Sequence, residues 1–78
     1  MRRQLYATTY AVFQPQRTDD LRPGAAAFIG QAGEFMEGWE IESGPYAGQR
    51  AMLVPMSWAL RLAPMSWVPE CDLVEVAR

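Results

Sequence analysis

Carboxylates are the side chains in this sequence whose number and spacing could support acid–base chemistry. Glu34, Glu37, Glu40 and Glu42 fall close together in the chain, and a pair of carboxylates can serve as general acid and general base. If the segment is extended, Glu40 and Glu42 lie on one face, because side chains alternate along a strand. That arrangement is typical of a solvated strand edge, so we interpret these glutamates as surface charges rather than as a catalytic pair.

The other side chains needed for catalysis are missing or isolated. The sequence has no histidine, which is the usual general base near neutral pH, and it has a single cysteine, Cys71. One chain therefore lacks the ligands of a zinc site. Glu70 and Asp72 flank Cys71, and their charges are expected to raise the pKa of its thiol and to weaken it as a nucleophile. Ser57 and Ser66 have no His or Lys to activate them. We expect no catalytic residue, no metal site and no cofactor.

The composition is that of one small soluble domain. The 78 residues are half apolar, include five Met and three Trp, and carry a net charge of −2. All seven basic residues are Arg. The acidic balance disfavours nucleic acid as the sole partner, because phosphate neutralisation dominates that kind of binding. A single cysteine is typical of a reducing compartment, and no segment approaches the roughly 20 apolar residues of a membrane span. We therefore expect a single cytoplasmic domain over residues 1–78, with no membrane contact.

Short apolar segments separated by Gly and Pro predict a β-rich fold. Residues 4–13 are rich in β-branched and aromatic side chains on both faces, which indicates a strand that ends before Pro15. Residues 14–24 concentrate turn-forming side chains and predict a long exposed loop. Further strands are expected over residues 39–42 and 73–76.

Residues 25–37 allow two interpretations. The apolar residues from Phe28 to Met36 recur at i, i+1, i+4, i+7 and i+8, the spacing of an amphipathic helix. Gly30 and Gly33 oppose a helix, because each costs about 1 kcal/mol in a helix interior. The other interpretation, which we favour, is a hairpin that turns through these glycines. The predicted fold class is all-β, a small SH3-like barrel of about five strands, with an α+β fold carrying one short helix at 25–37 as the alternative.

Residues 51–62 alternate apolar and other side chains, which predicts a further strand. Pro55 lacks the N–H of a sheet ladder, so it is expected at an edge or a bulge. The sequence Pro-Met-Ser-Trp occurs at 55–58 and again at 64–67. We interpret the two copies as similar strands that face each other across a turn near Arg61.

The segment 38–54 resembles the KOW motif of small SH3-like barrels in transcription-elongation factors and ribosomal proteins. In both, a strand runs into a Gly-Pro-aromatic loop and returns after a second glycine, and this chain departs from the family at Ala51, where a glycine is usual. The resemblance covers about 17 of the 78 residues and implies contact with the transcription or translation machinery. The implied binding loop contains Gly44, Pro45, Tyr46, Gly48 and Arg50.

Two further segments resemble SH3-like barrels. Residues 66–76 resemble the closing strand–turn–strand, and residues 5–10 resemble the first strand of SH3 domains. This likeness implies a peptide groove lined by Tyr6, Tyr10, Trp58, Trp67 and Pro69. The competing interpretation is that the two tryptophans fill the core.

We predict a non-enzymatic binding module that recognises a protein partner. The aromatic excess supports this prediction, since Trp and Tyr are enriched at the energetic centres of interfaces. The acidic balance and the absence of Lys favour a protein surface over RNA. One alternative is a self-associating chain that binds or converts a small molecule in a cleft shared between subunits. Another is an acidic inhibitor protein from a mobile element.

Overall fold

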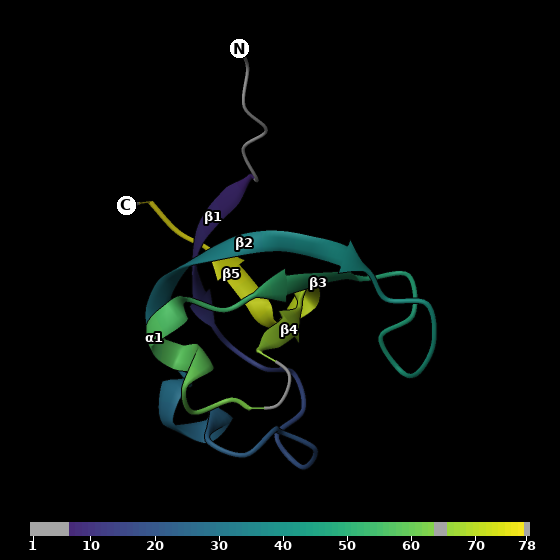
Figure 1. Cartoon of the computed structure of the whole chain (residues 1–78), viewed down its shortest axis with the longest axis horizontal. Helices are drawn as coiled ribbons and strands as arrows, with labels where there is room; N and C mark the ends of the chain where they lie inside the picture. The colour runs from purple at the N-terminus through teal and green to yellow at the C-terminus, as the bar shows by residue number, and fades with distance from the viewer. Residues whose placement is uncertain (1–6, 64–65, 78) are drawn as a thin grey trace.

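The computed structural model describes residues 7–63 and 66–77, and it is built mainly of β-strands. Five antiparallel strands form one sheet in the order β4-β3-β2-β1-β5 (Figure 1). The strands are β1 (Thr8–Phe13), β2 (Ala32–Glu40), β3 (Arg50–Leu53), β4 (Trp67–Pro69) and β5 (Leu73–Glu75). The described residues also form two 3-10 helices, η1 (Ala25–Phe28) and η2 (Glu70–Asp72), and one helical turn, α1 (Met56–Ala59).

The sheet curls into a half-barrel, and its connectivity shows why. Strands β4 and β5 lie at opposite ends of the strand order, yet only the three residues of η2 separate them in the chain. A link of that length spans at most about 10 Å. The two ends of the sheet must therefore come close together. The fold class is confirmed as a small all-β, SH3-like barrel of five strands.

The core lies inside the curl and is centred on Trp58. The indole of Trp58 is 5 % exposed and stacks on Phe28 with ring centroids 4.3 Å apart. The rings of Phe13 and Phe35 meet it edge-on at 6.2 and 5.2 Å. Edge and offset contacts of this kind suit the aromatic quadrupole and add to the free energy gained from burial.

The predicted strand over residues 51–62 is wrong beyond Leu53. Pro55 precedes α1 instead of standing at a strand edge, and the N–H groups of Trp58 and Ala59 donate to its carbonyl oxygen. The first copy of the repeated tetrapeptide is thus helical, whereas Trp67 of the second copy starts β4. Because the copies differ in structure, they do not face each other as two similar strands. Pro64 and Met65 lie outside the described residues.

Both interpretations of residues 25–37 are also wrong in part. Ala25–Phe28 is a 3-10 helix rather than the first arm of a hairpin, and no helix continues to residue 37 because β2 begins at Ala32. Gly30 makes the turn between them with a φ of +84°. The long exposed loop over 14–24 agrees with the prediction. Within the predicted strand over 4–13, β1 covers Thr8–Phe13 and buries Ala11 and Phe13. In the described ranges, no helix is long and apolar enough to cross a membrane.

Candidate functional site

A hollow of about 200 Å³ opens where three distant parts of the chain meet. Its floor is made of core side chains, and its rim comes from the 14–24 loop, the 41–49 loop and the segment from β4 to η2. The lining residues are Phe13, Arg17, Asp20, Leu21, Arg22, Ala25, Tyr46, Leu62, Trp67, Val68, Pro69 and Asp72. We call this the first hollow.

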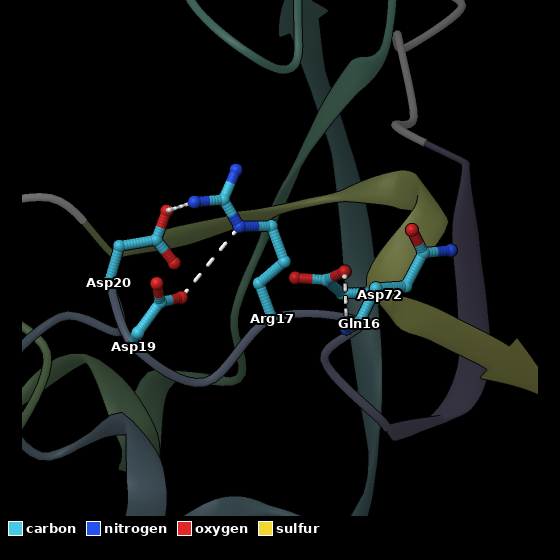
Figure 2. A network of polar contacts seen from close by, with 5 residues as sticks. All are labelled: Gln16, Arg17, Asp19, Asp20 and Asp72. Atoms are coloured by element: carbon cyan, nitrogen blue, oxygen red, sulfur yellow. Dashed lines mark hydrogen bonds and ion pairs between the residues drawn. The ribbon is translucent and has the colours of Figure 1, made fainter.

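Backbone hydrogen bonds fix the start of the 14–24 loop against η2. The N–H of Gln14 donates to the carbonyl oxygen of Asp72 at 2.7 Å, and the N–H of Gln16 donates to its carboxylate Oδ1 at 3.2 Å. Figure 2 shows the Asp72 carboxylate next to the backbone of Gln16, with the Arg17 side chain directed away from it, toward Asp19 and Asp20. Most of the loop is exposed to solvent, but these hydrogen bonds anchor its first residues to η2.

Arg17 belongs to a loose ion-pair network at the rim. Its guanidinium lies 3.7 Å from Asp19 and 3.9 Å from Asp20, and its side chain is 53 % exposed. Exposed pairs at such distances add little to stability. They nevertheless give Arg17 two carboxylate partners. Arg22, the other arginine of the hollow, has none among the described residues.

Arg22 is held against Trp67 by two contacts. Its guanidinium carbon lies 4.1 Å from the centre of the indole ring, within the range of a cation–π contact. Its Nη1 also donates a hydrogen bond to the carbonyl oxygen of Trp67. Burial lowers the pKa of Arg22 from its ordinary value. No carboxylate within the described residues forms an ion pair with it.

Tyr46 reaches the first hollow from the 41–49 loop. The N–H of Gly48 donates to the carbonyl oxygen of Ile41 at 2.9 Å, and the N–H of Ile41 donates to that of Gln49, so the loop closes on itself. Gly44 and Gly48 take positive φ angles, as the two turns require. Burial and the nearby charges of Asp72 and Asp20 raise the pKa of the Tyr46 phenol.

A second hollow of about 600 Å³ adjoins the first and shares Tyr46 and Trp67 with it. Its lining residues are Trp39, Glu40, Ile41, Glu42, Ser43, Pro45, Tyr46 and Trp67. Trp39 is 45 % exposed and meets Trp67 edge-on, with ring centroids 5.9 Å apart. Because the two hollows share these two side chains, we refer to them together as the Tyr46–Trp67 groove.

The groove takes in some of the residues singled out from the sequence. Tyr46, Trp67 and Pro69 line the first hollow, and Pro45 lines the second. Gly44 and Gly48 shape the loop without lining either hollow. Arg50 lies outside them and forms an ion pair with Glu37 at 3.8 Å.

The structure does not bring the described residues of the predicted aromatic patch together at one surface. Trp58 is a core residue, as the competing interpretation held, because α1 turns its indole beneath the sheet. Tyr10 is half-buried in β1 and lines neither hollow. Tyr6 lies outside the described residues. Of the four predicted patch residues that the structure describes, Trp67 and Pro69 line the groove and Tyr10 and Trp58 do not.

Most residues that line the groove are not marked as site residues by the sequence, and four of them matter most here: Asp20, Arg22, Trp39 and Asp72. Asp20 and Arg22 fall within the predicted loop over 14–24, Trp39 within a predicted strand, and Asp72 beside Cys71. A weak signal was available for Arg22 and Trp39, since Arg and Trp are over-represented at binding sites. No spacing in the sequence tied them to Trp67.

The described polar groups of the groove are not arranged as a set of metal ligands. Across residues 7–63 and 66–77, no three His, Cys, Asp or Glu side chains gather as metal ligands. Burial and the neighbouring Asp72 raise the pKa of the Cys71 thiol, as its flanking carboxylates led us to expect. The indole N–H of Trp67 is buried and has no hydrogen-bond partner among the described residues.

Comparison with protein families, with curated proteins and with solved structures finds no match to this chain.

Proposed function

We propose that this domain is a non-enzymatic binding module that recognises a segment of a protein partner in the Tyr46–Trp67 groove. The observation that carries the proposal is the pair of adjoining hollows, which share Tyr46 and Trp67 as a common wall. Two hollows in a row suit an extended chain with side chains to place in each. A single compact ligand would be enclosed on most sides by a deeper pocket.

The side chains of the groove are those that dominate binding energy at protein interfaces. Tyr46, Trp67 and Trp39 offer large rings with few rotatable bonds, so little conformational entropy is lost when a partner orders them. Leu21 and Pro69 add apolar surface beside these rings. We expect an apolar side chain of the partner to occupy each hollow.

The charge of the groove favours protein over nucleic acid. Glu40 and Glu42 line the second hollow, and Asp20 and Asp72 line the first. These carboxylates would repel a phosphate backbone, whose neutralisation by cations drives most nucleic-acid binding. The resemblance of segment 38–54 to the KOW motif supports a partner from the transcription or translation machinery.

The proposal is tested by affinity capture with two matched variants. The wild-type domain, a Tyr46→Ala variant and a Leu60→Ala control are each incubated with a nuclease-treated bacterial lysate, and retained proteins are identified by mass spectrometry. Leu60 is 84 % exposed and lines neither hollow, so its loss leaves the groove unchanged. We expect a protein retained by the wild type and the control to be depleted about tenfold or more with Tyr46→Ala.

A second measurement separates the proposal from self-association. The retained partner is produced alone, and its direct binding to the domain is measured by calorimetry. Binding that is equal for wild type and Tyr46→Ala would move the interface away from the groove and contradict the proposal. A domain that forms oligomers in light scattering and retains no partner would favour the shared-cleft alternative.

A further inference from the structure

Arg22 is the cation of the groove that lacks a counter-ion within the described chain. Asp20 and Asp72 line the same hollow, yet neither carboxylate lies within ion-pair distance of Arg22. Asp20 is engaged with Arg17 instead, and the Asp72 carboxylate accepts from the backbone N–H of Gln16. Arg17 is thus neutralised by the protein, whereas Arg22 is not.

The contacts of Arg22 fix its position without using up its hydrogen-bonding capacity. The face of the guanidinium rests on the Trp67 ring, and one N–H bonds the Trp67 carbonyl oxygen. A guanidinium carries five N–H donors in a rigid plane. Arg22 lines the first hollow, and its two contacts with Trp67 hold the side chain in place, so a partner that binds its remaining donors there costs little further side-chain entropy.

We propose that Arg22 binds a carboxylate of the partner segment, and that this contact determines which segments the groove accepts. The inference rests on the proposed function, since it names the chemistry of the ligand of the same groove. A carboxylate matches two parallel N–H donors of an arginine. It would also supply the counter-ion that a partly buried cation otherwise lacks, which a neutral side chain cannot do. Glu40 and Glu42 would then select against a second acidic residue at the other end of the segment.

The test uses random linear peptides displayed as a library and selected on the wild-type domain. Selected sequences are synthesised, and their affinities are measured for the wild type, Arg22→Gln, Arg22→Lys and Arg17→Gln. Arg17→Gln is the matched control, because it removes the other cation of the hollow, which the protein itself pairs. Circular dichroism reports whether each variant is folded.

We expect the selected peptides to share an Asp or Glu at one position. Arg22→Gln should weaken their binding about tenfold or more, and Arg17→Gln should weaken it much less. Replacing the shared Asp or Glu of the peptide by its amide should lower the affinity for the wild type by the same factor as Arg22→Gln does. The same replacement should not lower the affinity for Arg22→Gln any further. This peptide exchange needs no protein variant, so the test stands even if Arg22→Gln fails to fold. Synthesis with a free or an amidated C-terminus distinguishes a side-chain carboxylate from a terminal one.

Two other outcomes overturn the inference in different ways. Peptides whose binding is lost in Tyr46→Ala, but which carry no acid or bind Arg22→Gln equally well, would refute the role of Arg22 and leave the proposed function standing. A library that yields no peptide dependent on Tyr46 would refute the groove as a peptide site, and the inference would fail together with it.

Discussion

Asp72 is 3 % exposed, and the nearby charge of Asp20 has the same sign, so it adds to the effect of burial. Burial raises the pKa of this side chain, and the hydrogen bond from the Gln16 N–H opposes the rise without cancelling it. The folded state therefore holds the proton of Asp72 more tightly than the unfolded state does. At neutral pH the ionised carboxylate therefore lowers the stability of the fold. The same carboxylate accepts the hydrogen bond that anchors the 14–24 loop.

This balance predicts the effect of Asp72→Asn on the pH dependence of stability. Asparagine keeps an Oδ1 acceptor for Gln16 and removes the buried charge. The contribution of Asp72 to the free energy of unfolding of the wild type should fall as pH rises from about pH 4 through its raised pKa. The variant has no carboxylate to ionise at this position. The difference in free energy of unfolding between the variant and the wild type should therefore grow over the same pH interval and stay constant above it. Urea unfolding at a series of pH values measures the difference, with the exposed Asp19→Asn as control; an advantage that shrinks as pH rises would contradict the assignment.

The end of the 14–24 loop, just before η1, is fixed in place at Gly24. Gly24 has a φ of +86°, and a Cβ added there would lie 2.2 Å from the backbone carbonyl oxygen of Arg61. The loop therefore packs directly against the chain that follows α1. Gly30 offers a matched comparison, because its φ is +84° and no atom lies within 4 Å of its would-be Cβ.

We expect Gly24→Ala and Gly30→Ala to differ in cost although the two backbones are alike. Gly30→Ala should lower the free energy of unfolding by about 1–2 kcal/mol, the cost of a left-handed conformation. Gly24→Ala adds a collision with rigid backbone and should cost on the order of 3 kcal/mol or more. Urea unfolding followed by tryptophan fluorescence measures both. Equal losses would show that the loop does not depend on its contact with Arg61.

The misassigned segment around α1 shows why element type was hard to predict. Val54, Trp58 and Leu62 are all buried, and their spacing of four residues satisfies both a strand period of two and a helix period near 3.6. The residues that decide between the two are Met56 and Leu60, which are 80 % and 84 % exposed. Both are apolar, so the sequence offered no polar residue to mark them as outward-facing.

At the scale of the whole molecule, the fold class was predictable and the groove was not. Short alternating segments between Gly and Pro turns reflect one buried and one exposed face, and this signal is local. The groove joins Arg22, Tyr46 and Trp67, which lie far apart in the chain and meet only when the sheet curls. Turn chemistry and resemblance single out Tyr46 and Trp67 in the sequence, but their meeting with Arg22 at one hollow depends on tertiary structure alone.

The order of the strands also sets the moment at which the domain can complete its fold as the chain is synthesised. Both edge strands of the sheet, β4 and β5, come from residues 67–75, at the yellow end of the colour scale in Figure 1. A nascent chain that has emerged only to residue 66 has neither edge, and β1 and β3 each lack a neighbour. Such non-local pairing is slow to form. We expect a chain arrested with residues 7–66 outside the exit tunnel to be cleaved readily by protease, and protection to appear only after Glu75 has emerged; earlier protection would mean that β1, β2 and β3 fold without their neighbours.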